Sequence, residues 1–203
     1  MILYRTFGNK MARPRSVDET DLIASLAKVF ADVGYEGASL ALLSKETGLQ
    51  RASLYHRFPD GKSQMASAVL QFVNAWLREH ILVHLNGSGP PAARLKSALG
   101  NFAQLYDSGR KSCLLNMLSS PRSGDGPFRE SIGAAFDALK DGFARLALDA
   151  GHDAKTAELC GERAVMLIQG SLVMCRGTGT TGPFANAMAS IETDLLGKPE
   201  PSA

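Results

Sequence analysis

The sequence predicts an all-α protein of about nine helices, in which a three-helix unit with helix-turn-helix geometry precedes a larger helical domain. Apolar residues recur every three or four positions along nearly the whole chain, glycine or proline interrupts each run, and no stretch alternates like a half-buried strand. With 203 residues, 45% of them hydrophobic and 21% charged, the chain can bury a core without disulfides. This composition excludes disordered, collagen-like and disulfide-dense classes.

The first helix is expected to begin at Ser16, because Ser16 and Glu19 have the spacing of a capping box. Apolar residues between positions 22 and 33 then recur at helical spacing. Gly34 is expected to end this helix.

Two short helices should follow, one from Ser39 to Gly48 and one from about Gln50 to Phe58. Gly48 provides the positive φ that the tight connection needs, so the pair has the geometry of a helix-turn-helix. Residues 59–61, Pro-Asp-Gly, read as a turn. The side chains expected to face the first helix are Leu43, Leu49 and Leu54.

The rest of the chain is divided into longer apolar-periodic runs. Helices are expected at about 62–85, 95–108, 113–118, 132–150, 154–176 and 183–196, with a polar loop at 119–127. The inner stripe of the 62–85 helix should be Met65, Val69, Phe72 and Trp76. The 154–176 helix is apolar on more than one face and must therefore be buried or packed against a partner. Gly161 and Gly170 would let another helix approach it closely.

These runs suggest four segments. They are a basic arm at 1–15, a helix-turn-helix domain at 16–62, a helical domain at 63–197 and a tail at 198–203. The excess positive charge lies at the N-terminus, because residues 1–15 carry four bases and no acid. Such an arm suits a phosphate backbone, and a solubilising tail is the alternative.

Cysteine usage and hydropathy point to the cytoplasm. The three cysteines have no C-x-x-C spacing, and an odd number makes a disulfide framework unlikely to form, so they are expected to be buried and reduced. No apolar run is long enough for a membrane span, and no signal peptide is recognisable.

The second short helix carries the residues that could read DNA. Its outward side chains are Gln50, Arg51, Ala52, Ser53, Tyr55 and His56. Arg and Gln can make bidentate hydrogen bonds to guanine and adenine in the major groove. Ser39 and Lys62 lie at helix N-termini, where free N–H groups favour phosphate oxygens.

Residues 34–62 resemble the TetR family of bacterial transcriptional regulators. The matching positions are Gly34, Tyr35, Ser39, Leu43, Gly48, Leu49, Ala52, Ser53, Leu54, Tyr55, Phe58 and Lys62. The resemblance implies a homodimer with a helix-turn-helix domain and a divergent helical domain for ligand binding and dimerisation, joined to its copy through about 154–176 and 183–196. It implies base contacts from Gln50, Arg51, Ala52 and His56.

The resemblance also implies phosphate contacts from Ser39, Tyr55 and Lys62, with Arg13 and Arg15 reaching an adjacent groove or the backbone. Ser44 stands where the family has alanine, and Gln50 replaces the family's Ser or Thr cap. Arg57 replaces His or Tyr, and Asp60-Gly61 lengthens the turn before Lys62. This turn is similar to that of the subgroup around the LmrA and YxaF regulators.

An effector should bind between helices of the second domain, in a mostly apolar cavity. The candidate lining residues are Phe72, Trp76, Phe102, Tyr106, Cys113, Met117, Phe136, Phe143 and Met166. Residues of these types more often belong to the plain core than to a pocket wall. Methionine and aromatic side chains suit a small apolar or aromatic ligand.

Other signals favour no catalysis and no cofactor. His80 and His84 are four residues apart on one helix, but they lack an H-E-x-x-H order and a third metal ligand. The Gly-rich stretch 177–182 has no preceding strand and reads as a link between helices. No nucleophile elbow is present in the sequence.

The function expected from the sequence is a DNA-binding repressor of an efflux or detoxification gene that a ligand releases from its operator. The alternative is a helical small-molecule-binding protein without sequence-specific DNA binding. A helical enzyme is a third, more distant reading.

Overall fold

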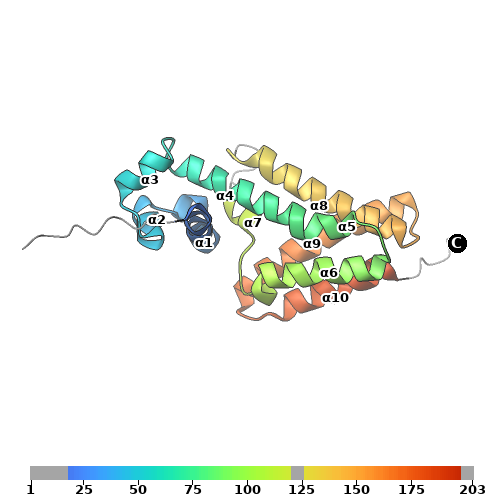
Figure 1. The fold of residues 1–203 in the computed structure, drawn as a ribbon. Coiled ribbons are helices and arrows are strands. Elements are labelled where there is room, and N and C mark those ends of the chain that lie inside the picture. The colour runs from blue at the N-terminus through green and yellow to red at the C-terminus, as the bar shows by residue number, and fades with distance from the viewer. Residues whose placement is uncertain (1–17, 120–125, 198–203) are drawn as a thin grey trace, which may run out of the picture.

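The computed structural model describes residues 18–119 and 126–197, and its helices follow the expected order (Figure 1). The elements are α1 (Glu19–Gly37), α2 (Leu40–Thr47), α3 (Arg51–Arg57), α4 (Lys62–Leu77), η1 (Arg78–Leu82), α5 (Val83–Leu85), α6 (Pro91–Leu105), η2 (Asp107–Gly109), α7 (Leu114–Leu118), α8 (Arg129–Asp149), α9 (Ala154–Thr178) and α10 (Gly182–Leu196). Because α4, η1 and α5 run on as one helix, the described ranges contain nine α-helical rods, which confirms the all-α prediction. The arm at 1–15, the tail at 198–203 and most of the 119–127 loop lie outside these ranges.

Helix α1 begins two residues later than its capping signal predicts. Its N-cap is Asp18, whose carboxylate accepts a hydrogen bond from the Thr20 backbone N–H at 3.2 Å. The expectation that Ser16 caps this helix was therefore wrong, and Ser16 itself lies outside the described residues. Either side chain can cap a helix, and here the acidic residue nearer the apolar run occupies the position.

Gly34 breaks the helical path of α1, as expected. Its φ of 71° is in the left-handed region, and the Ala38 N–H bonds back to the Gly34 carbonyl. A side chain there would also come within 3.1 Å of the Met117 carbonyl oxygen. The glycine thus allows α1 to end against α7.

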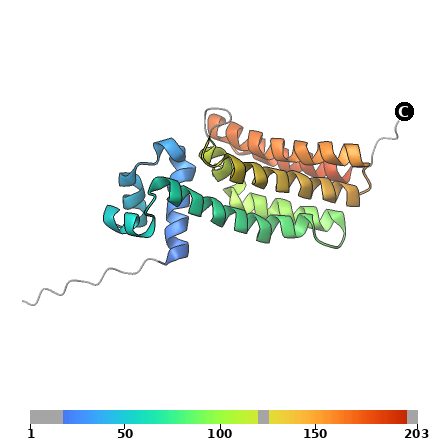
Figure 2. The same ribbon diagram turned by 90° about the horizontal axis from the view of Figure 1, so that it is seen from above.

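The helix-turn-helix forms as its spacing predicts. The Ser39 hydroxyl caps α2 by accepting from the Leu42 N–H at 3.2 Å, and Gly48 ends α2 in the left-handed conformation. Leu43 and Leu54 are fully buried against α1, and Leu49 is half-buried. Burial of these leucines fixes the crossing of α2 and α3, which lie at the outer end of the molecule (Figure 2).

The long helix α4–η1–α5 joins the two parts of the protein (Figures 1 and 2). Its first half packs on α1 through buried Met65 and Val69. Phe72 and Trp76 follow in the same stripe but are not core residues, since Phe72 is 39% exposed and Trp76 is half-buried. The expectation of an internal position was therefore wrong for Phe72, whereas Trp76 packs against the edge of the core.

The larger part is a bundle in which α9 lies between α8 and α10. Gly161 brings α9 against α8, because a side chain there would collide with the Lys140 carbonyl. Gly170 instead faces open space. No helix in the described ranges is long and apolar enough to cross a membrane.

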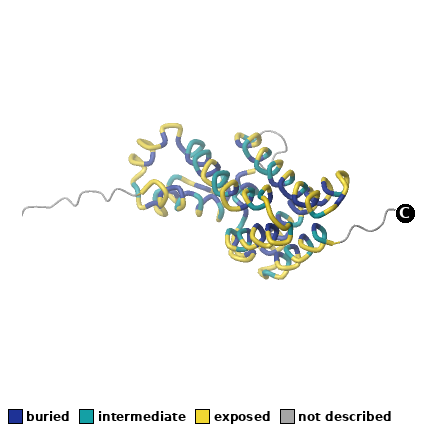
Figure 3. Tube along the Cα trace, turned by 45° about the vertical axis from the view of Figure 1, so that its right-hand side comes forward, coloured by how far each residue is buried: buried dark blue, intermediate teal, exposed yellow. Residues whose placement is uncertain are grey.

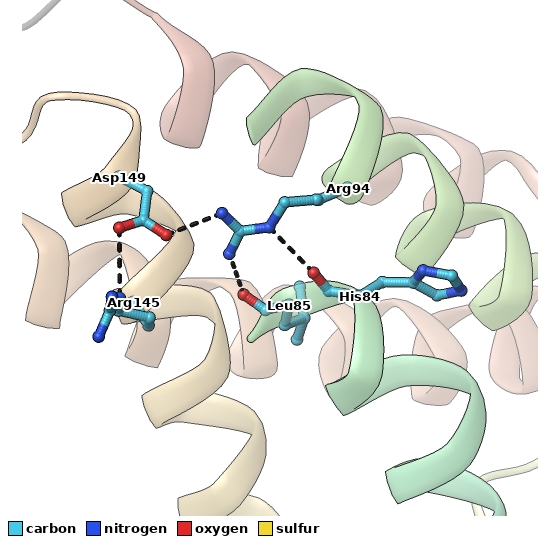
Figure 4. Close-up of polar contacts among 5 residues, drawn as sticks. All are labelled: His84, Leu85, Arg94, Arg145 and Asp149. Atoms are coloured by element: carbon cyan, nitrogen blue, oxygen red, sulfur yellow. Dashed lines mark hydrogen bonds and ion pairs between the residues drawn. The ribbon is translucent and has the colours of Figure 1, made fainter. Parts of the chain in front are cut away.

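A buried arginine fastens the far end of the long helix to this bundle (Figure 4). The Arg94 guanidinium on α6 donates to the carbonyls of His84 and Leu85, which end α5, and to Asp149 Oδ2 on α8 at 2.7 Å. Arg145 donates to the other Asp149 oxygen at 3.2 Å. Hydrogen bonding to Arg94 is the largest cause that holds the pKa of Asp149 below its ordinary value.

Candidate nucleic-acid interface and effector cavity

Helix α3 presents an exposed surface at the outer end of the molecule. Gln50 and the outward residues Arg51, Ala52, Ser53, Tyr55 and His56 are all exposed, whereas Leu54 is fully buried (Figure 3). The structure therefore leaves all six expected residues accessible at this end of the molecule. Arg13 and Arg15, the expected contacts from the arm, lie outside the described residues.

The connection between α2 and α3 is braced by side-chain hydrogen bonds. The Ser44 hydroxyl donates to the Leu49 carbonyl at 2.5 Å, and the Thr47 hydroxyl donates to the Leu43 carbonyl at 2.7 Å. Ser44 is the position where the sequence departs from the family's alanine, so the departure adds a bond across the turn. Gln50 is the N-cap of α3 but makes no side-chain capping bond, which leaves its amide available.

Two of the expected phosphate contacts already have internal roles. Ser39 uses its hydroxyl oxygen as the cap of α2. Lys62 donates to the Tyr35 carbonyl at 2.7 Å, and its ammonium lies 4.3 Å from the centre of the Tyr35 ring. An ammonium has three N–H donors, so Lys62 retains donors for a further acceptor. Lys62 thus ties the start of α4 to the end of α1.

A second tie joins α1 to α2. Lys28 on α1 donates to Glu46 on α2 at 2.5 Å. This hydrogen bond is the largest cause that raises the pKa of Lys28. Sequence reasoning did not identify the pair, because its partners are 18 residues apart and belong to different helices.

A cavity of about 720 Å³ lies between α1 and the residues of α4, α6 and α7. This size is within the range of small-molecule sites. Four of the nine candidate effector residues line it, namely Phe72, Trp76, Tyr106 and Cys113. The Tyr106 hydroxyl donates to the Cys113 sulfur at 3.4 Å, and burial is the largest cause that raises the pKa of Tyr106 well above its ordinary value.

The other five candidates lie elsewhere. Phe102 and Phe143 are fully buried and stack with ring centres 6.1 Å apart, so they belong to the core. Phe136 is half-buried beside that core, and Met117 accepts a bond from Arg176 at 2.8 Å. Met166 is 59% exposed on α9.

The lining residues that the sequence analysis missed include small and charged side chains. Helix α1 contributes Ala24, Ala27 and Ala31, and the segment before α7 contributes Arg110 and Lys111. The alanines recur every three or four residues on α1, beside the apolar stripe, which is a signal that the sequence does contain. Their lack of bulk leaves the space into which Phe72 and Trp76 project.

The paired histidines His80 and His84 are candidate metal ligands by their spacing alone. Across residues 18–119 and 126–197, no group of three or more His, Cys, Asp or Glu side chains is placed to hold a metal ion. The His80 ring instead stacks on Trp76 with ring centres 4.6 Å apart, and its Nδ1 lies 3.1 Å from the Trp76 carbonyl oxygen.

Family comparisons agree with this architecture. Residues 22–69 match the bacterial regulatory proteins of the tetR family, and residues 91–190 match the C-terminal domain of LmrA/YxaF-like transcriptional regulators. The chain is 22% identical over 156 residues to the uncharacterised HTH-type transcriptional regulator YxaF of Bacillus subtilis, covering 75% of this chain and 82% of YxaF. It is 28% identical over 78 residues to the regulator LmrA of the same organism, covering 38% of this chain and 42% of LmrA.

Solved structures share the fold. A TetR transcriptional regulator from Legionella pneumophila superposes with a TM-score of 0.77 at 17% identity, covering 89% of this chain and 98% of that one. A cysteine mutant of the TetR family regulator CifR, complexed with 26 bp double-strand operator DNA, superposes with a TM-score of 0.66 at 22% identity, covering 92% and 100%.

These features define a helix-turn-helix regulator with an appended helical domain. The chain belongs to the TetR family of bacterial transcriptional regulators, and its C-terminal domain is of the LmrA/YxaF-like type. It is therefore a DNA-binding transcriptional regulator, and homodimers are typical of its family.

Proposed function

We propose that this regulator is a homodimeric repressor that binds operator DNA through α3 and leaves it when a small apolar or aromatic effector binds. The observation that carries the proposal is the shared wall of the cavity. Helix α1 packs on α2, which contacts the DNA-reading helix α3, and α1 also borders the cavity. A ligand in the cavity therefore contacts the DNA-binding domain itself.

Exposed apolar side chains on α9 support the dimer interface that we propose. Leu159, Met166 and Val173 are exposed and seven residues apart, so they form one stripe along the helix. Gly170 lies in the same stripe with open space around it, which would permit a close approach of the partner helix. We assign this stripe, together with α10, to the contact between the two copies.

The dimer explains how a ligand could control affinity. Dimeric helix-turn-helix proteins place two recognition helices about 34–36 Å apart, or a multiple of that distance, to match turns of the duplex. An effector that favours another separation lowers operator affinity. Such coupling is typically about 1–3 kcal/mol and is reciprocal, so operator DNA must equally weaken effector binding. Genes for efflux or detoxification are the targets that an apolar aromatic effector suggests.

The test is a titration of purified protein with its own upstream intergenic DNA, labelled for fluorescence anisotropy, at two salt concentrations and with unlabelled competitor. We expect saturable binding that survives non-specific competitor and weakens at high salt, because phosphate contacts release counterions. Binding that any competitor abolishes would contradict the proposal and favour a ligand-binding protein without sequence-specific readout.

A further inference from the structure

The two walls of the cavity between α1 and α4 differ in chemistry. Phe72 and Trp76 of α4 form an aromatic wall, and both are only partly buried although they are large and apolar. Ala27 and Ala31 of α1 line the same cavity. A cavity lined by aromatic and small side chains leaves room for a flat ring, which would remove both aromatic residues from water.

The exposed residues of the cavity carry an excess of positive charge. Lys28, Arg110 and Lys111 line it with a single acid, Asp32. Lys28 is paired with Glu46, and Arg110 lies 3.8 Å from Asp107 in an exposed pair. For Lys111, no ion pair joins its ammonium to another residue in the described part of the chain.

We propose that this cavity binds an aromatic molecule that bears one acidic group, with the ring between Phe72, Trp76 and the α1 alanines and the acid at Lys111 and Arg110. Lys111, the lining cation that no ion pair in the described part of the chain neutralises, favours an anion over a cation or a neutral molecule. The binding step stands on the cavity alone, whereas its effect on transcription rests on the function proposed above.

Lys28 connects this site to the DNA-reading unit. Lys28 lines the cavity, and its ammonium holds Glu46 on α2, the helix that contacts α3. An anion in the cavity competes with Glu46 for Lys28 and loosens the tie between α1 and α2. The acid group of the ligand would thus act on the helix-turn-helix directly, in addition to the steric effect of its ring on α1.

The experiment compares two fluorescent probes that share a ring system. Anilinonaphthalene sulfonate carries one negative charge, and phenylnaphthylamine is its neutral counterpart. Trp76 is the sole tryptophan of the chain, so quenching of tryptophan emission reports on a ring bound beside it. The full-length protein is titrated with each probe in the absence of DNA.

Three variants test the assignment. Lys111→Met removes an exposed cation at the cavity, Lys155→Met removes an exposed cation on α9 as the matched control, and Ala31→Leu fills the space beside the aromatic wall. We expect Lys111→Met to weaken binding of the anionic probe about two- to fivefold, which is the size of effect found for exposed charge pairs. Binding of the neutral probe should not change. Ala31→Leu should weaken binding of both probes, and Lys155→Met should affect the binding of neither probe.

Each of the other possible results would contradict one part of the proposal. Equal affinity of the two probes, or an anionic probe insensitive to Lys111→Met, would overturn the preference for an acid. Unchanged binding in Ala31→Leu, with its thermal unfolding also unchanged, would overturn the location. If the probes behave as expected but the protein binds no operator, the proposed function fails while the site stands.

Discussion

Replacement of Arg94 by methionine tests how the long helix is fastened to the bundle. The side chain is 7% exposed and makes three hydrogen bonds, to the carbonyls of His84 and Leu85 and to Asp149 (Figure 4). Methionine retains an apolar side chain of similar length to the arginine stem, but it has none of the N–H donors of the guanidinium. The Leu85 carbonyl then loses its Arg94 partner, and the His84 carbonyl keeps the Gly87 N–H at 3.3 Å. Asp149 keeps only Arg145.

The expected loss of stability follows from these contacts. A hydrogen bond to a charged group contributes about 1.5–3 kcal/mol, and buried Arg94 makes two such bonds to backbone carbonyls. The Asp149 side chain is 30% exposed, so hydration of its carboxylate offsets part of the free energy lost with the ion pair. We therefore expect Arg94→Met to lower the free energy of unfolding by about 4 kcal/mol, or the Tm by about 8–16 °C at 2–4 °C per kcal/mol.

Urea and thermal unfolding at neutral pH provide the measurement, with Arg145→Met as the matched control. The Arg145 side chain is 66% exposed and forms its ion pair with Asp149 at the surface, so its loss should cost less than about 1 kcal/mol. If the two variants are equally stable, the argument that Arg94 fastens the end of α5 is refuted.

The same pair predicts a dependence on pH. The pKa of Asp149 lies below its ordinary value of 3.8, so its contribution to stability is present above that value and is lost as the pH falls through the lower pKa of the folded state. The difference in stability between the wild type and Arg94→Met should therefore shrink as the pH falls below about 4. A difference that stays constant in acid would exclude the Asp149 carboxylate as its source.

Three further variants test the interfaces. Arg51→Ala should reduce discrimination among operator variants by about 1–3 kcal/mol in anisotropy titrations, and unchanged discrimination would remove Arg51 from base readout. Lys62→Ala should weaken binding to all DNA sequences alike and lower the slope of log affinity against log salt concentration by about one unit. An unchanged slope would show that Lys62 makes no phosphate contact and serves only its internal bond to Tyr35. Met166→Asp should turn the dimer into a monomer in sedimentation experiments, because carboxylates would meet across the α9 stripe, whereas Val83→Asp, a similarly exposed site on α5, should not.

The helix-turn-helix was predictable because its signals are local. Ser39 and Gly48 each act within a few residues of their own position, and the cap and the turn form where the sequence places them. Ser16 shows the limit of the same reasoning. Two acceptable caps lie within one turn, and local rules alone do not say which of Ser16 and Asp18 is used.

The cavity was only partly predictable, because periodicity identifies a helix face but not its neighbour. Met65 and Phe72 belong to one stripe of α4, yet Met65 packs into the core and Phe72 borders open space. The difference comes from α1, whose small side chains Ala27 and Ala31 line the same cavity. Likewise Phe102 and Tyr106 are both buried aromatics, and only their tertiary positions separate a core residue from a lining residue.

The central claim is that two copies of α3 read one face of operator DNA. The most direct measurement is a footprint of the purified protein on its upstream DNA, with the monomeric Met166→Asp variant alongside. The account predicts two protected half-sites whose centres lie about 34–36 Å apart, or a multiple of that distance, and weak or absent protection by the variant. Protection of a single site, or equal protection by the variant, would contradict it.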